Sequence, residues 1–218
     1  MVNKVHITIV GAGSWGTTLG IIIARRGIPV TLLARTLEES NELQNNRRNL
    51  RFIPNEIFPD RLSITNDLTK AFSGATLIIL AVPCNSMRKN ANLIKEYLKE
   101  NPVVLSVSKG LDIETGKTMS SVLQEVLREE SWSQICVLSG PNLASEILAG
   151  KPASAVVASK LSAPAQYAQK LMISPLFRIY TNHDVMGVEL GGALKNIIAI
   201  GAGICEGLSM EKIANRPS

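Results

Sequence analysis

Residues 5–20 read VHITIVGAGSWGTTLG: an apolar, β-branched run, then a glycine-rich turn, then a segment with helical apolar spacing. The turn has the pattern G-x-G-x-x-G, formed by Gly11, Gly13 and Gly16. Between a strand and a helix, this pattern is typical of a turn that binds the pyrophosphate of a dinucleotide. The first glycine allows the tight turn, the second lets the phosphates approach the backbone, and the third lets helix and strand pack closely. The alternative is a glycine turn that binds nothing.

The alternation of strand and helix continues along the chain. The predicted strands are apolar and rich in β-branched residues: Val5–Val10, Val30–Ala34, Thr76–Val82, Val103–Val107, Gln134–Leu138, Ala155–Ala158 and Phe177–Thr181. The predicted helices between them are Thr17–Arg26, Met87–Glu100, Lys117–Glu129 and Pro164–Ile173. Continuously apolar strands separated by helices indicate a mostly parallel sheet that is covered on both faces. The fold class is therefore α/β, with a doubly wound, Rossmann-like sheet.

The alternation of short strands and helices ends after Thr181. The triplet Asn-His-Asp at 182–184 offers a helix N-cap, and the next twenty or so residues are rich in Gly, Ala, Leu and Ile at helical spacing. We expect a dinucleotide-binding domain over residues 1–184 and the first helix of an all-α domain over 185–218. Because the chain supplies almost nothing to cover so apolar a helix, we expect exposed apolar surface that favours aggregation or a homodimer.

The composition excludes several classes of protein. The chain has 218 residues, of which 45% are hydrophobic and 19% charged, and it has no G-X-Y or heptad period, so it is neither disordered nor fibrous. Its net charge is +5, and the densest basic cluster, at residues 47–51, is too short for a nucleic-acid-binding arm. We therefore expect an anionic small molecule as the partner, and no nucleic acid.

The cysteines and the apolar runs bear on the location of the protein. The three cysteines are scattered and lack disulfide or zinc spacing, which favours a reducing compartment and argues against a metal site. No apolar run reaches the roughly 20 residues that a membrane helix needs. We expect a cytoplasmic protein without membrane insertion.

The end of the second predicted strand bears on the choice of dinucleotide. NAD-selective folds usually place an acidic residue there, on the ribose 2′-hydroxyl, whereas this chain has Arg35. A guanidinium can pair with a 2′-phosphate and stack on adenine. Arg35 therefore favours NADP over NAD, or acceptance of both; the alternative is an ordinary exposed arginine.

Three more segments are candidates for a functional site: two follow predicted strands, and the third lies in the last predicted helix. SVSKGL at 106–111 and LSGPNLASE at 138–146 fall where ligands bind in open α/β sheets, outside the carboxyl ends of the strands. VELGGALKN at 188–196 places Lys195 in an apolar helix with no evident polar face. A lysine in such surroundings is a candidate functional residue, although most lysines are solvated and have no such role.

The chain closely resembles the NAD(P)-dependent glycerol-3-phosphate dehydrogenases of the bacterial type in six segments. In order along the chain, these are GAGSWGTTLG, NDLTKAF, AVP, SKGL, SGPNLASE and GVELGGALKNIIAIGAGICEGL. The resemblance covers about residues 5–208. It implies reversible hydride transfer between NAD(P)H and dihydroxyacetone phosphate, which gives sn-glycerol 3-phosphate for phospholipid synthesis.

The resemblance also implies roles for particular residues. Besides the glycine turn, the residues implied to contact the cofactor are Ser14, Trp15, Arg35, Lys109 and Ala144. Those implied to contact the substrate are Lys109, Gly140, Asn142 and Lys195, with Lys195 as the general acid/base at the C2 oxygen. A lysine suits that role because hydride delivery builds negative charge on the ketone oxygen. A nearby cation and an apolar helix would lower the pKa of the amine, and the substrate phosphate would raise it.

The chain departs from the family pattern in two places. The family usually has Ser or Thr at Asn142 and an aromatic residue or His at Leu143. Residues 209–218 resemble nothing that the family has at this place, and the dipeptide at 215–216 is not its phosphate-binding Arg-Asn pair. We therefore expect a dehydrogenase that lacks most of its C-terminal domain. The alternatives are an inactive nucleotide-binding fragment, or another NADP-linked two-domain dehydrogenase of the ketopantoate or 6-phosphogluconate type.

Overall fold

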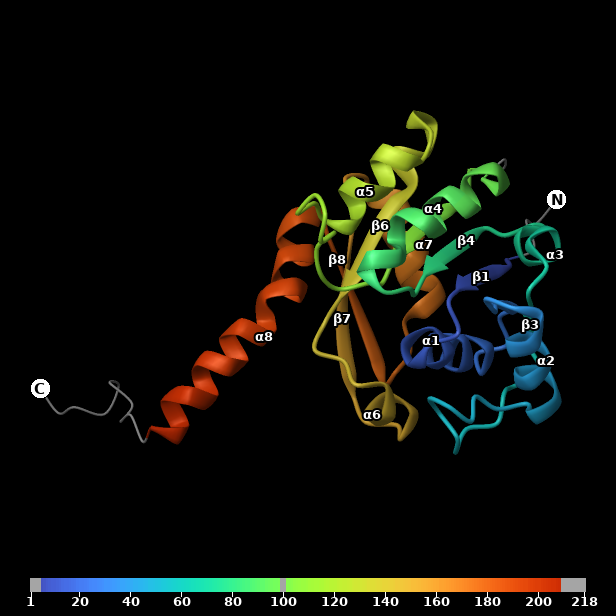
Figure 1. Ribbon diagram of the computed structural model, residues 1–218, viewed down its shortest axis with the longest axis horizontal. Helices are drawn as coiled ribbons and strands as arrows, with labels where there is room; N and C mark the ends of the chain where they lie inside the picture. The colour runs from blue at the N-terminus through green and yellow to red at the C-terminus, as the bar shows by residue number, and fades with distance from the viewer. Residues whose placement is uncertain (1–4, 99–100, 209–218) are drawn as a thin grey trace, which may run out of the picture.

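The computed structural model describes residues 5–98 and 101–208, which form one eight-stranded sheet with helices on both faces (Figure 1). The strand order is β3-β2-β1-β4-β5-β6-β7-β8. The strands are β1 Ile7–Val10, β2 Val30–Leu33, β3 Leu62–Thr65, β4 Leu77–Leu80, β5 Val103–Ser106, β6 Ile135–Ser139, β7 Ala153–Ala158 and β8 Phe177–Asn182. Strands β1 to β6 are parallel, β7 is antiparallel to β6, and β8 is parallel to β7. The predicted doubly wound, mostly parallel sheet is confirmed.

The helices cover the sheet and extend beyond it. They are α1 Ser14–Ala24, α2 Leu37–Asn46, α3 Leu68–Phe72, α4 Met87–Ile94, α5 Met119–Val126, α6 Ala144–Leu148, α7 Ser162–Met172 and α8 Val185–Gly207. Short 3-10 helices lie at Cys84–Ser86, Lys95–Tyr97 and Glu129–Gln134. The order of the strands reverses between β1 and β4, the kind of switch point at which open α/β sheets bind ligands.

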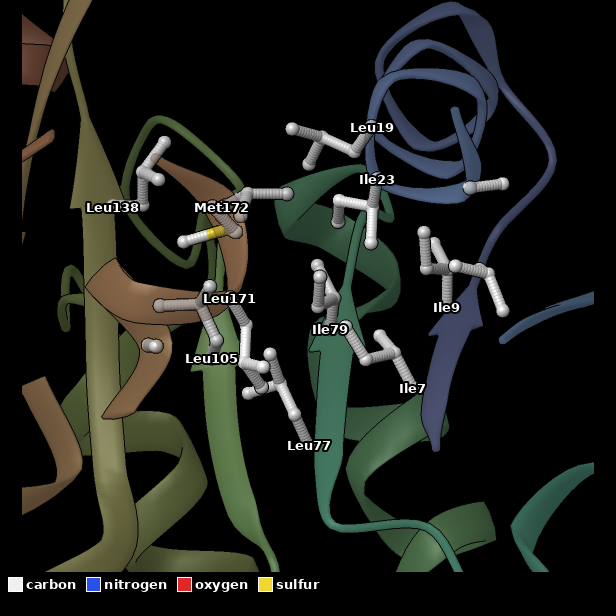
Figure 2. Packing of buried hydrophobic residues seen from close by; sticks show 14 of the residues in the cluster. Ile7, Ile9, Leu19, Ile23, Leu77, Ile79, Leu105, Leu138, Leu171 and Met172 are labelled. Carbon is white, nitrogen blue, oxygen red and sulfur yellow. The ribbon is translucent and has the colours of Figure 1, made fainter. Parts of the chain in front are cut away.

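The strands are apolar throughout because the sheet has a core on each face. Along β4, Leu77 and Ile79 belong to one cluster, and Ile78 and Leu80 belong to the other, as the two-residue period of a strand requires. Helices α1 and α7 supply the first cluster with Leu19, Ile23, Leu171 and Met172, shown in Figure 2 against β1, β4 and β5. Helices α4 and α5 supply the second, with Met87, Ile94 and Val122 among others. These two cores hold the carboxyl ends of the parallel strands in place.

Four short elements are absent from the sequence-based prediction. Strand β3 has four residues and helices α3 and α6 have five each, too few to show a period. Helix α2 reads LEESNELQNN and buries only Ser40 and Leu43, so its apolar face is too sparse to register. The other predicted elements are present, with ends shifted by a few residues; the end of the predicted helix Met87–Glu100, at residues 99–100, lies outside the described residues.

Helix α8 leaves the sheet and runs outward (Figure 1). Its N-cap is Asp184, whose Oδ1 accepts a hydrogen bond of 2.8 Å from the Gly187 N–H, so the predicted capping segment is confirmed. All 23 residues of the helix are described, and only Glu189 is buried. Its exposed large side chains are Met186, Leu194, Ile197, Ile198, Ile200 and Ile204. The expected apolar exposure is confirmed.

The length of α8 bears on the membrane prediction. By length and composition alone this helix could cross a membrane. The absence of membrane insertion and the domain boundary at residue 184 remain predictions.

Candidate functional site

The glycine turn lies between β1 and α1, and its three glycines do not have the same surroundings. Gly11 has a φ of +108°, and a Cβ there would lie 2.5 Å from the Ala81 carbonyl oxygen. A Cβ on Gly16 would lie 2.1 Å from the Gly11 carbonyl oxygen. A Cβ on Gly13, by contrast, would meet no atom within 4 Å. Packing therefore requires glycine at 11 and 16, whereas at 13 its absence of a side chain leaves space.

The start of α1 offers unsatisfied donors beside that space. Gly13 is the N-cap and supplies no side-chain cap, and the first intrahelical bond runs from Thr17 N–H to the Gly13 carbonyl oxygen. The N–H groups of the first turn therefore have no partner within the helix. A helix N-terminus of this kind suits an anion such as a pyrophosphate.

A cleft of about 500 Å³ opens next to this helix start. Its lining combines Ser14 of α1, the loop 52–56, and residues 143–145, 148 and 149 in and around α6. This volume lies within the usual range for a small-molecule site. The cleft brings together Ser14 and Ala144, which are far apart in the sequence and are both predicted cofactor contacts.

Asn49 ties the cleft wall to the glycine turn, and the sequence analysis missed it. It is buried, and its Nδ2 donates to the Ala12 carbonyl oxygen at 2.8 Å and to Thr17 Oγ1 at 2.9 Å. Its Oδ1 accepts from the Phe52 N–H at 3.2 Å. A single buried asparagine thus fixes the loop against the turn. The sequence gives no sign of it, because a polar residue after two arginines reads as solvated.

Two predicted cofactor contacts lie elsewhere around the turn. Arg35 follows β2, and its side chain is 72% exposed and paired with Glu39. Trp15 is half-buried, with its ring edge-to-face on Phe177 at a centroid distance of 6.5 Å. Its indole Nε1 is buried without a hydrogen-bond partner among the described residues. Trp15 therefore packs α1 against β8, and its predicted cofactor contact remains a prediction.

The predicted substrate residues meet at the carboxyl ends of β5 and β6. Lys109 Nζ donates a 2.6 Å hydrogen bond to the Gly140 carbonyl oxygen, which also accepts from the Asn142 N–H at 2.9 Å. Burial, and secondly the positive charge of Lys195, lower the pKa of the Lys109 ammonium below its ordinary value. The structure therefore brings both lysines to one place, although 86 positions separate them in the sequence.

Asn142 carries an unusual pair of unpartnered atoms. Its Oδ1 and Nδ2 are both buried, and neither has a hydrogen-bond partner in the part of the chain that the structure describes. Leaving buried polar atoms unpaired costs free energy, so such atoms call for an explanation. An amide that can both donate and accept, beside Lys109 and Gly140, suits a polar ligand.

Gly192 brings α8 onto this group of residues. A Cβ on Gly192 would lie 2.3 Å from Ser139 Oγ, at the end of β6, and 3.8 Å from Lys109 Cγ. One turn further along the helix is Lys195. Lys195 was expected to lack a polar face, but it is exposed, as are all residues of α8 from 194 onwards, where the helix extends away from the sheet (Figure 1). That expectation is corrected.

Glu189 anchors α8 to the start of α5. Its carboxylate is buried and accepts 2.8 Å from the Ser120 N–H and 2.5 Å from Ser120 Oγ. These bonds cap α5, whose N-cap Thr118 supplies no side-chain bond to the helix. Acceptors at a helix N-terminus stabilise its free N–H groups and its dipole. The sequence around Glu189 does not predict this role, because nothing local indicates contact with Ser120, 69 residues earlier in the chain.

The Cys84 thiol lies under the same site. Its Sγ donates to the Lys109 carbonyl oxygen at 3.0 Å. Burial, and to a lesser extent the charge of Glu189, raise the pKa of this thiol. Cys84 is therefore protonated at neutral pH and contributes packing. Residues 5–98 and 101–208 contain no group of three His, Cys, Asp or Glu side chains that could hold a metal ion.

We expect Glu189→Leu to destabilise the protein by about 2–3 kcal/mol, because it removes two hydrogen bonds to a carboxylate and leaves the Ser120 N–H without its partner. Glu189→Gln keeps one acceptor oxygen and should lose less than half as much. The midpoints of urea unfolding measure both changes. Equal midpoints for the leucine variant and the unmodified chain would show that α8 does not depend on this anchor.

The lowered pKa of Lys109 predicts how stability depends on pH. Its folded-state pKa lies below the unfolded value, so at alkaline pH the unfolded chain binds more protons, and stability from this group rises with pH. Lys109→Met removes this unfavourable charge and should stabilise the chain at neutral pH by on the order of 0.5 kcal/mol after solvent screening. The gain should shrink towards pH 10.

Urea unfolding at neutral pH and near pH 10 tests this prediction. Lys89→Met, at an exposed lysine on α4, is the matched control and should change neither value. If Lys109→Met raises the stability by the same amount at both pH values, the gain does not come from the lowered pKa of Lys109.

Nearly three quarters of the chain match a known family model. Residues 6–165 match the model described as NAD-dependent glycerol-3-phosphate dehydrogenase N-terminus, and residues 184–216 match the corresponding C-terminus model. The second match includes most of residues 209–218, so the expectation that this segment resembles nothing in the family is wrong. These ten residues lie outside the described structure.

Curated relatives give the same result. The glycerol-3-phosphate dehydrogenase [NAD(P)+] of Dehalococcoides mccartyi is 48% identical over 204 residues, which is 93% of this chain and 57% of the relative. That of Moorella thermoacetica is 41% identical over 207 residues, or 95% and 61%. The chain therefore spans about three fifths of the length of these relatives.

Solved structures agree on the fold. Glycerol-3-phosphate dehydrogenase from Coxiella burnetii has a TM-score of 0.84 at 32% identity, with 96% of this chain and 63% of that chain covered. A ketopantoate reductase from Ralstonia eutropha has a TM-score of 0.62 at 18% identity, with 84% and 58% covered, and shares the fold alone.

Proposed function

Because the chain belongs to the NAD-dependent glycerol-3-phosphate dehydrogenase family, we propose that it forms the dinucleotide-binding part, and one wall of the substrate site, of an oxidoreductase. The reaction is the interconversion of dihydroxyacetone phosphate and sn-glycerol 3-phosphate with NAD(H) or NADP(H). The observation that carries this proposal is the meeting of three separate segments. Lys109 donates to Gly140, Gly192 of α8 lies against Ser139 and Lys109, and the charge of Lys195 acts on Lys109.

The residues around the turn fit a dinucleotide. The open space at Gly13 and the uncapped start of α1 suit the pyrophosphate, and the cleft between Ser14 and Ala144 suits the rest of the molecule. Arg35 would hold a 2′-phosphate, which supports use of NADPH. When bound, the nicotinamide supplies or takes up the hydride.

The residues of the chain supply the other parts of the chemistry. Lys195 would hold the proton at the substrate C2 oxygen, which becomes negative as the ketone is reduced. Lys109, oriented by the Gly140 carbonyl, adds a second positive charge on the same side. The unpartnered amide of Asn142 would hydrogen-bond a substrate oxygen and so orient it.

Three broader features also belong to the proposal. The product has the phosphorylated glycerol backbone of phospholipids, which supports a role in phospholipid synthesis. The charged, water-soluble substrates and the free cysteines support a cytoplasmic location. The exposed apolar residues of α8 support pairing with a second copy, as in a homodimer.

Two measurements test the proposal. The first is binding of NADPH and NADH to residues 1–218, followed by the fluorescence of the reduced nicotinamide. The second is consumption of NADPH with dihydroxyacetone phosphate, for 1–218 and for a version extended by the remaining C-terminal part of a relative. Binding by both forms with turnover by either supports the proposal. Binding without turnover by either form would favour the inactive fragment, and no binding would refute the proposal.

A further inference from the structure

The guanidinium of Arg35 is already engaged along one edge. Glu39 Oε2 accepts from the Arg35 backbone N–H at 2.7 Å and from Nε at 3.4 Å, and Glu39 Oε1 accepts from Nη2 at 3.2 Å. The carboxylate therefore lies side-on against the guanidinium, in the two-point arrangement that Arg also uses to bind phosphate. An internal anion therefore occupies two of the three guanidinium nitrogens that could bind a ligand phosphate.

Glu39 is the better fixed of the two side chains. It lies in the first turn of α2, where its N–H donates to Oγ1 of the N-cap Thr36 at 3.1 Å. Its side chain is 20% exposed, against 72% for Arg35. The helix start fixes the backbone of Glu39, and the Arg35 backbone N–H holds its carboxylate, whereas the guanidinium of Arg35 extends into solvent.

The two dinucleotides meet this pair differently. A 2′-phosphate at Arg35 must use the remaining donors beside a fixed carboxylate, or displace that carboxylate, and both cost free energy because the two anions repel each other. A ribose 2′-hydroxyl has no such charge and can donate a hydrogen bond to the carboxylate. The pair thus attracts the phosphate through Arg35 and opposes it through Glu39.

We propose that Glu39 is a specificity-determining residue that competes with the 2′-phosphate of NADP(H) for Arg35, and so holds the preference of the site close to balance between NADP(H) and NAD(H). This inference rests on the proposed dinucleotide binding. It qualifies the preference for NADP that Arg35 alone suggests.

Glu39→Gln tests the proposal in the 218-residue chain. Glutamine keeps an oxygen that can accept from the Arg35 N–H and removes the charge. We expect NADPH to bind about 3- to 10-fold more tightly, because one partly exposed negative charge near the phosphate is removed. The affinity for NADH should change less than twofold. The shift should decrease at high salt. The dissociation constants come from fluorescence titration with NADPH and NADH.

Glu38→Gln is the matched control. Glu38 lies in the same first turn of α2 and is exposed, and its substitution changes the net charge equally. It should leave the ratio of the two dissociation constants unchanged. A second control places Glu39→Gln in an Arg35→Leu background, where the competition has no target and the shift should disappear.

Each outcome decides the matter. A ratio that moves only with Glu39→Gln, and only when Arg35 is present, supports the proposal. Equal shifts for Glu38→Gln and Glu39→Gln, or a shift that persists without Arg35, would overturn it, because charge alone would then be sufficient. If the unmodified chain binds neither NADPH nor NADH, the proposed function is refuted, and this inference with it. If it binds both, but Glu39→Gln leaves the ratio of the two dissociation constants unchanged, this inference alone is refuted.

Discussion

Gly16→Ala is expected to destabilise the protein by about 3 kcal/mol or more, and to remove dinucleotide binding with it. The new methyl would lie 2.1 Å from the Gly11 carbonyl oxygen and 3.1 Å from the Ala81 side chain, and a backbone oxygen cannot rotate aside. Helix propensity alone would favour alanine at this position in α1. A loss of stability would therefore report the close packing of α1 on the turn. Urea unfolding measures it.

Gly13→Ala is the matched comparison, with the same chemical change three residues earlier. Its φ of −73° suits alanine, and its Cβ would meet no protein atom within 4 Å. Stability should change by less than about 1 kcal/mol, as for other N-cap substitutions. NADPH binding should weaken at least tenfold, because the methyl enters the space that the phosphates need. Unchanged binding in this folded variant would favour a glycine turn that binds nothing.

Lys195→Ala is expected to reduce turnover by about 10²- to 10⁴-fold in the form extended by the C-terminal part of a relative, because it removes the proposed proton donor at the C2 oxygen. NADPH affinity should change less than twofold. The rate of NADPH consumption with dihydroxyacetone phosphate and a parallel binding titration measure the two effects.

Lys195→Arg separates charge from proton transfer. Arginine keeps the positive charge but does not give up a proton near neutral pH. The turnover of the arginine variant should therefore stay at least tenfold below that of the unmodified enzyme. Turnover by the alanine variant within tenfold of normal would contradict the acid/base assignment.

The central part of the fold could be predicted from sequence because its signals are local. Each of β1, β2, β4 and β5 is a four-residue run that is buried throughout, so continuous apolarity identifies it. Helix α2 and strand β3 were missed because their stability comes from contacts with distant parts of the chain. Gln44, for example, donates to the Ile64 carbonyl across that pair of elements. The reversal of β7 is likewise set by its neighbours and cannot be seen in its own residues.

The candidate site divides in the same way. The glycine turn and the segments containing Lys109 and Lys195 have recognisable patterns, and they lie between β1 and α1, after β5, and in α8 respectively. Asn49 and Glu189 have no such pattern, because each acts through a buried bond to a segment far along the chain. The exposure of Lys195 could not be predicted either, since it depends on where α8 crosses the end of β6.

The reversed strands at the edge of the sheet decide which part of α8 arrives at Lys109. Because β8 runs against β6, it ends beside Ala158, level with Val137 in the middle of β6, and the helix then turns back towards the carboxyl edge. Lys195 comes ten residues into the helix, about 15 Å from its start. Main-chain hydrogen bonds hold the backbone on both sides of it. A parallel β8 would end at the carboxyl edge and place the first turn of α8 there, whereas the reversal places a turn from the middle of the helix at that edge.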